Sequence, residues 1–288
     1  MDKGMVDVTF TVGGERVAGT FTPATGSPRG TLLMVHGMQS RRLEFGAAPE
    51  ALGKRGYHVL AIDLRGHGDS AGARGIVSRA RAVEDVRGAL AWLRENGHAR
   101  GGRLGIIGHS LGGALSAACL ADIPDLRCGV LVAPVNRLTD ELHPFEFLGY
   151  KMAGRLSAVA HRFTGAHLSV PYKLTYKHLF DDKEAMRRAK AQGFLDTKLT
   201  LGNYDNFLAV CGSEWASQVA QPTLVVVCKN DRALKPASQR KVYEALKGPK
   251  DLLELDSGHS AFTDRNHALL LDAIDGWMEK TLGAIPQV

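Results

Sequence analysis

Residues 108–112, Gly-His-Ser-Leu-Gly, are of the types that present an activated nucleophile. The segment fits the pattern G-x-S-x-G and lies between an apolar run, 104–107, and a small-residue stretch, 111–120. In a sharp turn from strand to helix, flanking glycines make room for a serine whose hydroxyl stands at the helix N-terminus. The alternative is a serine in an ordinary tight turn. We predict that Ser110 is the nucleophile of an acyl-transfer reaction.

A serine hydroxyl is a weak nucleophile at neutral pH and needs a base, for which histidine is suited. Where a serine occupies this kind of turn, the order along the chain is serine, acid, histidine. His259 follows the last apolar run, 251–255, on a loop that a glycine precedes. His267 is the other histidine beyond residue 220, and we expect it on the surface of the final helix. His259 is therefore the predicted base.

The acid is expected directly after the preceding apolar run, 223–227, and Asp231 stands there. A buried carboxylate at this place accepts a hydrogen bond from the histidine, fixes its tautomer and stabilises the imidazolium. Asp256 is an alternative close to the histidine in sequence, but it is typical of a turn. Asp196 and Asp205 are further alternatives, inside a separate insertion. Asp231 is the predicted acid.

The oxyanion of the tetrahedral intermediate needs preorganised hydrogen-bond donors. One is the backbone N–H of Leu111, the residue after the nucleophile. The second is expected from the loop that follows the apolar run 31–35, where His36 and Gly37 turn the chain and Met38 offers its N–H. We interpret His36 as a structural hydrogen-bonding residue rather than as a base.

Residues 63–70, Asp-Leu-Arg-Gly-His-Gly-Asp-Ser, form a second polar loop after an apolar run. A phosphate-binding loop is the alternative interpretation, but no Lys-Ser/Thr follows and no helix begins at once. We expect a buried ion pair or hydrogen-bond web that braces the site, with His67 as a member.

Short apolar runs alternate with helical patterns along most of the chain. Continuous runs of this kind indicate strands that are covered on both faces, and their alternation with helices predicts a doubly wound, mostly parallel α/β sheet. An alternating segment at 5–22, broken by two glycines, predicts an antiparallel hairpin before it. The apolar runs are 31–35, 57–62, 104–107, 129–132, 223–227 and 251–255, and the helical patterns are 80–95, 237–247 and 265–282.

The alternation stops at residues 135–217, which show no clear strand, a helix-like segment at 182–192 and many aromatic residues. We interpret this stretch as a helical lid inserted into a core made of residues 1–134 and 218–288. It leaves the core at the carboxyl end of a strand, where sheets of this kind bind ligands. A stabilising excursion that never meets substrate is the alternative.

Composition excludes several classes of protein. The hydrophobic fraction of 44% and the charged fraction of 23% are typical of globular proteins. The net charge of +6 comes without a basic run, so we expect no nucleic-acid partner. The four cysteines form no CxxC pair and the histidines show no metal-ligand spacing, so we expect no disulfide, metal or cofactor. With no signal peptide or long apolar segment to be seen, we expect a cytoplasmic location and no membrane span.

Taken together, five motifs resemble those of the α/β-hydrolase superfamily, in the monoacylglycerol-lipase and serine-aminopeptidase-like branch. They are His36-Gly37, Asp63-x-Arg65-Gly66-His67-Gly68-x-Ser70, Gly108-x-Ser110-x-Gly112-Gly113, Asp231 and Ser257-Gly258-His259. The resemblance covers the core and leaves the insertion unmatched. It implies the α/β-hydrolase fold, the three catalytic residues named above and oxyanion donors at Met38 and Leu111. Met38 would also make that side of the pocket apolar and pliable.

These features favour a hydrolase that cleaves a carboxylic ester of a small molecule through an acyl-enzyme, with an apolar, medium or long acyl group. An acyltransferase, thioesterase or cyclase with the same three residues is a second hypothesis, and a non-catalytic binding protein is a third. Residues 151–200 hold ten Lys or Arg and four Asp or Glu. This basic surface either receives an acyl carrier or an anionic lipid, or is a solvated helix face.

Overall fold

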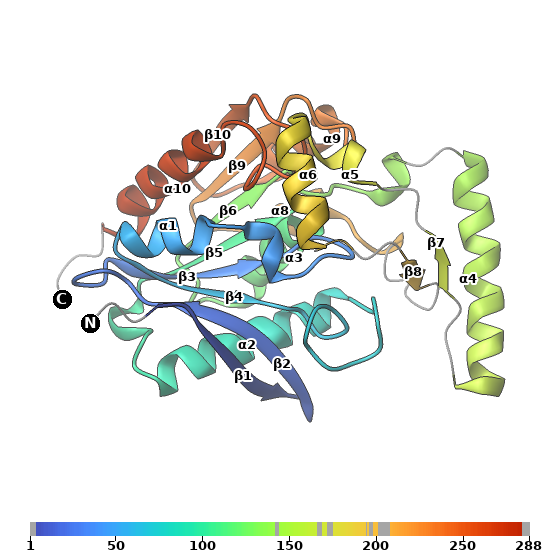
Figure 1. Cartoon of the computed structure of the whole chain (residues 1–288), viewed down its shortest axis with the longest axis horizontal. Coiled ribbons are helices and arrows are strands. Elements are labelled where there is room, and N and C mark those ends of the chain that lie inside the picture. The colour runs from blue at the N-terminus through green and yellow to red at the C-terminus, as the bar shows by residue number, and fades with distance from the viewer. Residues whose placement is uncertain are drawn as a thin grey trace.

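The computed structural model describes residues 4–141, 144–165, 169–171, 175–193, 195, 198–200 and 208–283. At its centre lies an eight-stranded sheet with the strand order β1-β2-β4-β3-β5-β6-β9-β10 (Figure 1). β2 pairs antiparallel with β1 and β4, and all other pairings are parallel, which confirms the predicted mostly parallel sheet. The strands are β1 (Val6–Val12), β2 (Glu15–Thr22), β3 (Gly30–Val35), β4 (Tyr57–Ile62), β5 (Leu104–His109), β6 (Cys128–Val132), β9 (Thr223–Cys228) and β10 (Lys250–Leu255).

Helices cover both faces of this sheet. α1 and α10 pack with one face, and α2, α3, α8 and α9 pack with the other, so that two apolar layers enclose the strands. The predicted hairpin and the three predicted helices are confirmed. The helices are α1 (Ala48–Lys54), α2 (Arg79–Glu95), α3 (Leu111–Asp122), α8 (Gly212–Ala216), α9 (Pro236–Ala245) and α10 (His267–Leu282), with short 3₁₀ turns η1 (Arg42–Phe45), η2 (Arg100–Gly102) and η3 (Leu138–Asp140).

The segment between β6 and β9 is mostly helical. α4 (Pro144–Thr164) is its longest element and stands to one side of the sheet, while α5 (Tyr176–Leu179) and α6 (Lys183–Gln192) lie closer to the core (Figure 1). The expectation of no strand was wrong, because β7 (Ser169–Pro171) and β8 (Lys198–Thr200) pair antiparallel. Three-residue strands are too short to leave a periodic pattern in the sequence.

The last helix of that segment, α8, packs in the helical layer that covers one face of the sheet. α8 packs with α3 and α9, and Trp215 and Ala216 lie in the same apolar cluster as α2 and α3. The predicted insertion, 135–217, therefore includes residues that complete the core. The division of the chain into core and lid remains a prediction.

Close packing at the start of α3 generates a test of the fold. A Cβ on Gly112 would collide with the carbonyl oxygens of Val35 and His36, whereas a Cβ on Gly149 in α4 would meet open space. We expect Gly112→Ala to lower the free energy of unfolding by about 1–3 kcal/mol through overpacking. Gly149→Ala is expected to raise it by about 0.5–1 kcal/mol, because alanine loses less entropy in a helix. Urea denaturation measures both, and equal stability of the two variants would contradict the packing described.

Candidate active site

Ser110 occupies a strained turn between β5 and α3. Its φ of 57° and ψ of −119° lie outside the regions that residues with a side chain usually adopt. Gly108 makes this possible, because a Cβ there would collide with the carbonyl oxygen of Gly112 and the hydroxyl of Ser116. The Ser110 N–H donates to the Val132 carbonyl oxygen, and three amides, including that of Val135, donate to the Ser110 carbonyl oxygen. The turn thus presents the hydroxyl at the carboxyl edge of the sheet.

The loop after β10 brings His259 to this serine. The Nε2 atom of His259 lies 2.9 Å from Ser110 Oγ, and its Nδ1 atom lies 2.6 Å from Asp231 Oδ2. All three residues are buried. The structure therefore brings together the three side chains that the sequence predicts as nucleophile, base and acid, in a chain of two hydrogen bonds.

Asp231 is held by more donors than the histidine alone. Its Oδ1 atom accepts from the backbone amides of Ala233 and Leu234, at 2.7 and 2.8 Å. Its Oδ2 atom also accepts from Gln239 Nε2 at 2.7 Å, and the Gln239 Oε1 atom accepts from the amide of Cys228. Gln239 is fully buried on α9. Sequence reasoning missed it, because a single glutamine in an amphipathic helix carries no signal of its own.

The rejected alternatives lie elsewhere. Asp256 is exposed and accepts from Asn230 at 2.5 Å. His267 is exposed at the first turn of α10, and its Nδ1 atom contacts the carbonyl oxygen of Asp264 at 3.1 Å. Asp196 and Asp205 lie outside the described residues.

The predicted oxyanion donors flank the serine. Leu111 begins α3 directly after it, and a Cβ on Gly37 would lie 3.1 Å from Ser110 Cβ, so the loop carrying Met38 passes close by. Among the described residues, neither the Met38 amide nor the Leu111 amide donates to another protein group. Their role as oxyanion donors stays a prediction.

A buried ion pair lies beneath the serine, and its acid was not anticipated. Glu44 Oε1 is 3.0 Å from His109 Nδ1 and also accepts from the amide of Gly37 at 2.8 Å. Burial opposes both charges, but their mutual attraction and hydrogen bond outweigh it, so the pKa of Glu44 is lowered and the pKa of His109 is raised. No local pattern marks Glu44. It lies in η1, after two arginines and before the small residues 46–48.

The predicted web around residues 63–70 is confirmed as a set of buried contacts. Asp63 pairs with Arg42 and accepts from the Arg42 amide at 2.7 Å, and Arg65 pairs with Asp85. His67 is buried, and burial together with the nearby His36 lowers the pKa of its ring to about 3. It is therefore neutral at physiological pH.

His36 has the structural role expected of it. Its Nε2 atom accepts a hydrogen bond from the backbone amide of Leu64 at 3.1 Å, and its side chain is fully buried. The contact ties the end of β3 to the loop after β4. Its Nδ1 atom lies 2.7 Å from the Gly37 carbonyl oxygen, so both ring nitrogens of His36 are engaged and neither is placed to act as a base on the serine.

The segment that contains α5 and α6 is attached to the histidine loop. The amide of Ser260 donates to the Leu179 carbonyl oxygen at 2.8 Å. Asp264, which is buried, accepts from the amides of Asp181 and Asp182, each at 2.8 Å. The inserted segment thus contacts the loop that positions His259, and Asp264 is a second buried acid that sequence reasoning missed.

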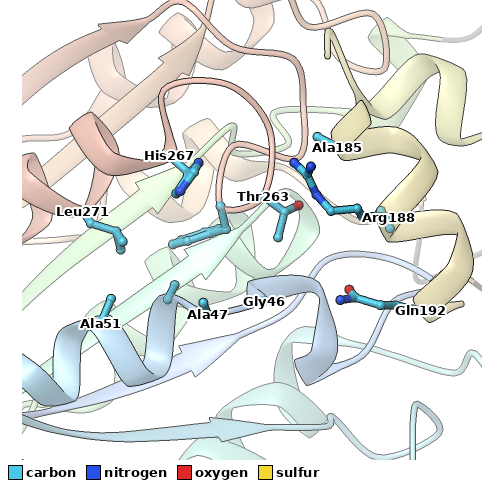
Figure 2. Close-up of a pocket in the computed structure, with 12 residues that line it drawn as sticks. Gly46, Ala47, Ala51, Ala185, Arg188, Gln192, Thr263, His267 and Leu271 are labelled. Carbon is cyan, nitrogen blue, oxygen red and sulfur yellow. The ribbon is translucent and has the colours of Figure 1, made fainter. Parts of the chain in front are cut away.

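A groove of about 280 Å³ lies beside the site, between α1, α6 and α10 (Figure 2). Small side chains such as Ala51 and Ala185 line most of it, and Arg188 and Gln192 face it from α6. Its lining includes Phe262, whose ring meets that of His109 edge-on with centroids 6.1 Å apart. The groove therefore borders the residues behind the serine.

The described ranges contain neither a candidate metal cluster nor a membrane-spanning helix. No group of three His, Cys, Asp or Glu side chains there is arranged to hold a metal ion. No helix in the same ranges is long and apolar enough to cross a membrane.

Comparison with known proteins places the chain in a family. Residues 26–265 match the family model described as serine aminopeptidase, S33. The chain belongs to this family. It is an α/β hydrolase, and the resemblance stated from its motifs is confirmed at that level.

Individual relatives agree with this placement. A monoacylglycerol lipase of Mycolicibacterium smegmatis is 27% identical over 276 residues, covering 93% of this chain and 94% of the relative. The structure of DcsB with its substrate analogue has a TM-score of 0.83 at 17% identity, covering 98% and 100% of the two chains. A monoacylglycerol lipase of Paleococcus ferrophilus has a TM-score of 0.71 at 23% identity, covering 96% and 98%. The two structural likenesses show a shared fold.

The contacts of Gln239 generate a test of the site in this hydrolase. Gln239→Leu removes a donor from the Asp231 carboxylate, so the carboxylate is less firmly held against His259. We expect fluorophosphonate labelling of Ser110 to slow about tenfold. A hydrogen bond to a charged group contributes about 1.5 kcal/mol or more, and about 1.4 kcal/mol corresponds to a factor of ten in rate. Gln221→Leu is the control, since the half-buried Gln221 donates to the Leu120 carbonyl oxygen near the far end of α3. Equal labelling rates in the two variants would contradict a role for Gln239 in holding the acid.

Proposed function

We propose that this protein is a serine hydrolase that cleaves carboxylic esters with apolar, medium or long acyl groups. The observation that carries the proposal is the chain of hydrogen bonds from Ser110 Oγ to His259 Nε2, at 2.9 Å, and from His259 Nδ1 to Asp231 Oδ2, at 2.6 Å. This arrangement allows the imidazole to take the serine proton while the carboxylate stabilises the resulting charge.

The proposed reaction has two stages. Ser110 Oγ attacks the ester carbonyl carbon as its proton passes to His259, and the oxyanion is held by the amides of Met38 and Leu111. His259 then gives the proton to the leaving alcohol, and an acyl-enzyme remains. In the second stage His259 takes a proton from water, the hydroxide attacks the acyl carbon, and the carboxylic acid leaves as Ser110 regains its proton.

The inserted helix supports an apolar substrate. Six large apolar side chains on α4 are more than half exposed and recur at spacings of three or four residues, which puts them on one helix face. They are Phe145, Leu148, Met152, Leu156, Val159 and Phe163. An exposed apolar patch of this kind marks an interaction site for apolar groups. The name of the mycobacterial relative, monoacylglycerol lipase, also supports an ester with an apolar acyl chain.

Hydrolysis and acyl transfer share the first stage of the reaction. One observation favours acyl transfer as a second candidate function. Lys151, Arg155 and Arg162 follow one another at spacings of four and seven residues, so they share an edge of α4 next to the apolar face. An anionic acyl carrier would suit this edge. Product analysis with and without an added amine or alcohol acceptor distinguishes the two, since a transferase forms the acylated acceptor in preference to the free acid.

The nucleophile is tested by its removal. We expect Ser110→Ala to lower kcat/KM for a p-nitrophenyl ester by about three to six orders of magnitude, because the remaining residues only bind and polarise the ester. A fluorophosphonate probe should label the wild type and not this variant. Near-normal turnover in Ser110→Ala would refute the assignment, and failure to label the wild type would favour a binding protein without catalysis.

Acyl-chain preference is tested with a series of p-nitrophenyl esters from acetate to laurate, beside matched amide and thioester substrates. We expect kcat/KM to be highest for a medium or long ester, because each buried methylene contributes about 0.8 kcal/mol. A Leu156→Glu, Val159→Glu double variant should lose several-fold of kcat/KM on the long ester and little on acetate. Leu269→Glu is the matched control, since Leu269 is an equally exposed leucine on α10. A flat chain-length profile would contradict the proposed substrate class.

A further inference from the structure

The buried pair of Glu44 and His109 stands at the meeting point of three loops. His109 is the last residue of β5 and directly precedes the proposed nucleophile, while Glu44 lies in η1 after the loop of Met38. Both side chains are 5% exposed. The two groups do not touch the reacting atoms, and the proposed mechanism makes no use of them.

Both ring nitrogens of His109 face acceptors. Nδ1 lies 3.0 Å from Glu44 Oε1, and Nε2 lies 2.9 Å from the backbone carbonyl oxygen of His259. Despite burial, the attraction and hydrogen bond of His109 lower the pKa of Glu44, so Glu44 is a carboxylate at neutral pH. Neither a carboxylate nor a carbonyl can donate, so His109 must donate from both nitrogens. A neutral imidazole has one N–H, and only the imidazolium has two. The geometry therefore requires a charged His109 directly behind the serine.

We propose that the Glu44–His109 ion pair is a positioning device that holds the oxyanion loop and the catalytic-histidine loop against the nucleophile turn while His109 is an imidazolium. The inference rests on the proposed function. The same Glu44 Oε1 atom accepts from the Gly37 amide, one residue before Met38, so a single carboxylate ties the oxyanion loop to the ring that holds His259. A displacement of about 1 Å in such a constellation can cost about a hundredfold in rate.

The surroundings give this pair a pH dependence with a definite sign. Glu44 from η1, His36 from the end of β3, His259 from its loop and Asp231 from the loop after β9 are the charged or titratable groups that face the pair. Because the pKa of His109 is raised in the folded protein, its contribution is fully present below the unfolded value and is lost as pH rises through the folded value. Above that pH one ring nitrogen carries a lone pair toward an acceptor, and kcat is expected to fall with little change in KM.

The test compares Glu44→Gln with Glu44→Leu. A glutamine oxygen in the place of Glu44 Oε1 can accept from both Gly37 and His109, but a neutral amide does not stabilise the imidazolium as the carboxylate does. We therefore expect Glu44→Gln to retain more kcat than Glu44→Leu and to move the alkaline decline of the wild type to lower pH. Glu44→Leu leaves the Gly37 amide and His109 Nδ1 without their acceptor, and we expect about a hundredfold lower kcat. Glu50→Gln, which alters an exposed glutamate paired with Lys54, is the control and should keep the wild-type profile.

A measurement that needs no turnover separates this inference from the proposed function. In the full chain carrying Ser110→Ala, nitrogen-15 NMR of the His109 ring is expected to show both nitrogens protonated at neutral pH, and one of them protonated after Glu44→Gln is added. Removal of one member of a buried ion pair can prevent folding, so the glutamine variant carries the test if Glu44→Leu is insoluble. A neutral His109 at pH 7, or an unchanged alkaline decline in Glu44→Gln, would overturn the inference.

Discussion

The close approach of α3 to the end of β3 is the constraint on which the rest of the site depends. Ser110 adopts its positive-φ backbone because Gly108 and Gly112, two residues before and two residues after it, carry no Cβ that would meet neighbouring carbonyl oxygens. Once the turn is made, the serine hydroxyl, the first amide of α3 and the loop after β3 must lie within a few ångströms of one another. The energetic cost of the strained turn is offset by the packed layers on both faces of the sheet.

Around that turn the protein buries charged groups and satisfies each of them. Asp231 accepts from two backbone amides, an amide side chain and His259, and Glu44 accepts from Gly37 and His109. Buried charges without such partners would be costly, and with them the groups are fixed before substrate arrives. Apart from Gln239 on α9, these partners lie at or just beyond the carboxyl ends of parallel strands, where a sheet of this topology gathers its functional residues.

The inserted segment divides into two parts with different relations to the site. The part with α5 and α6 is hydrogen-bonded to the loop of His259. Leu179 accepts from Ser260 of that loop, and Asp264 of the loop accepts from two amides that follow α5. This part therefore helps to hold the loop of the predicted base. α4 lies apart from the sheet (Figure 1). Its exposed side chains form an apolar face with a basic edge. The proposed catalytic geometry thus depends on the sheet layers and on the part with α5 and α6, whereas α4 offers the surface to which we assign substrate preference.

The sequence by itself determined the strand and helix alternation, the nucleophile turn, and the assignment of Asp231 and His259 to the ends of successive strands. These features are local, because apolar periodicity and glycine placement act within a few residues, and parallel strands bring their carboxyl ends to one edge. Only the tertiary structure decided that Gln239, Glu44 and Asp264 support them, and that two three-residue strands pair across the insertion. Such partners are chosen by three-dimensional proximity over long stretches of chain, so in the sequence each resembles any polar residue on a helix or loop.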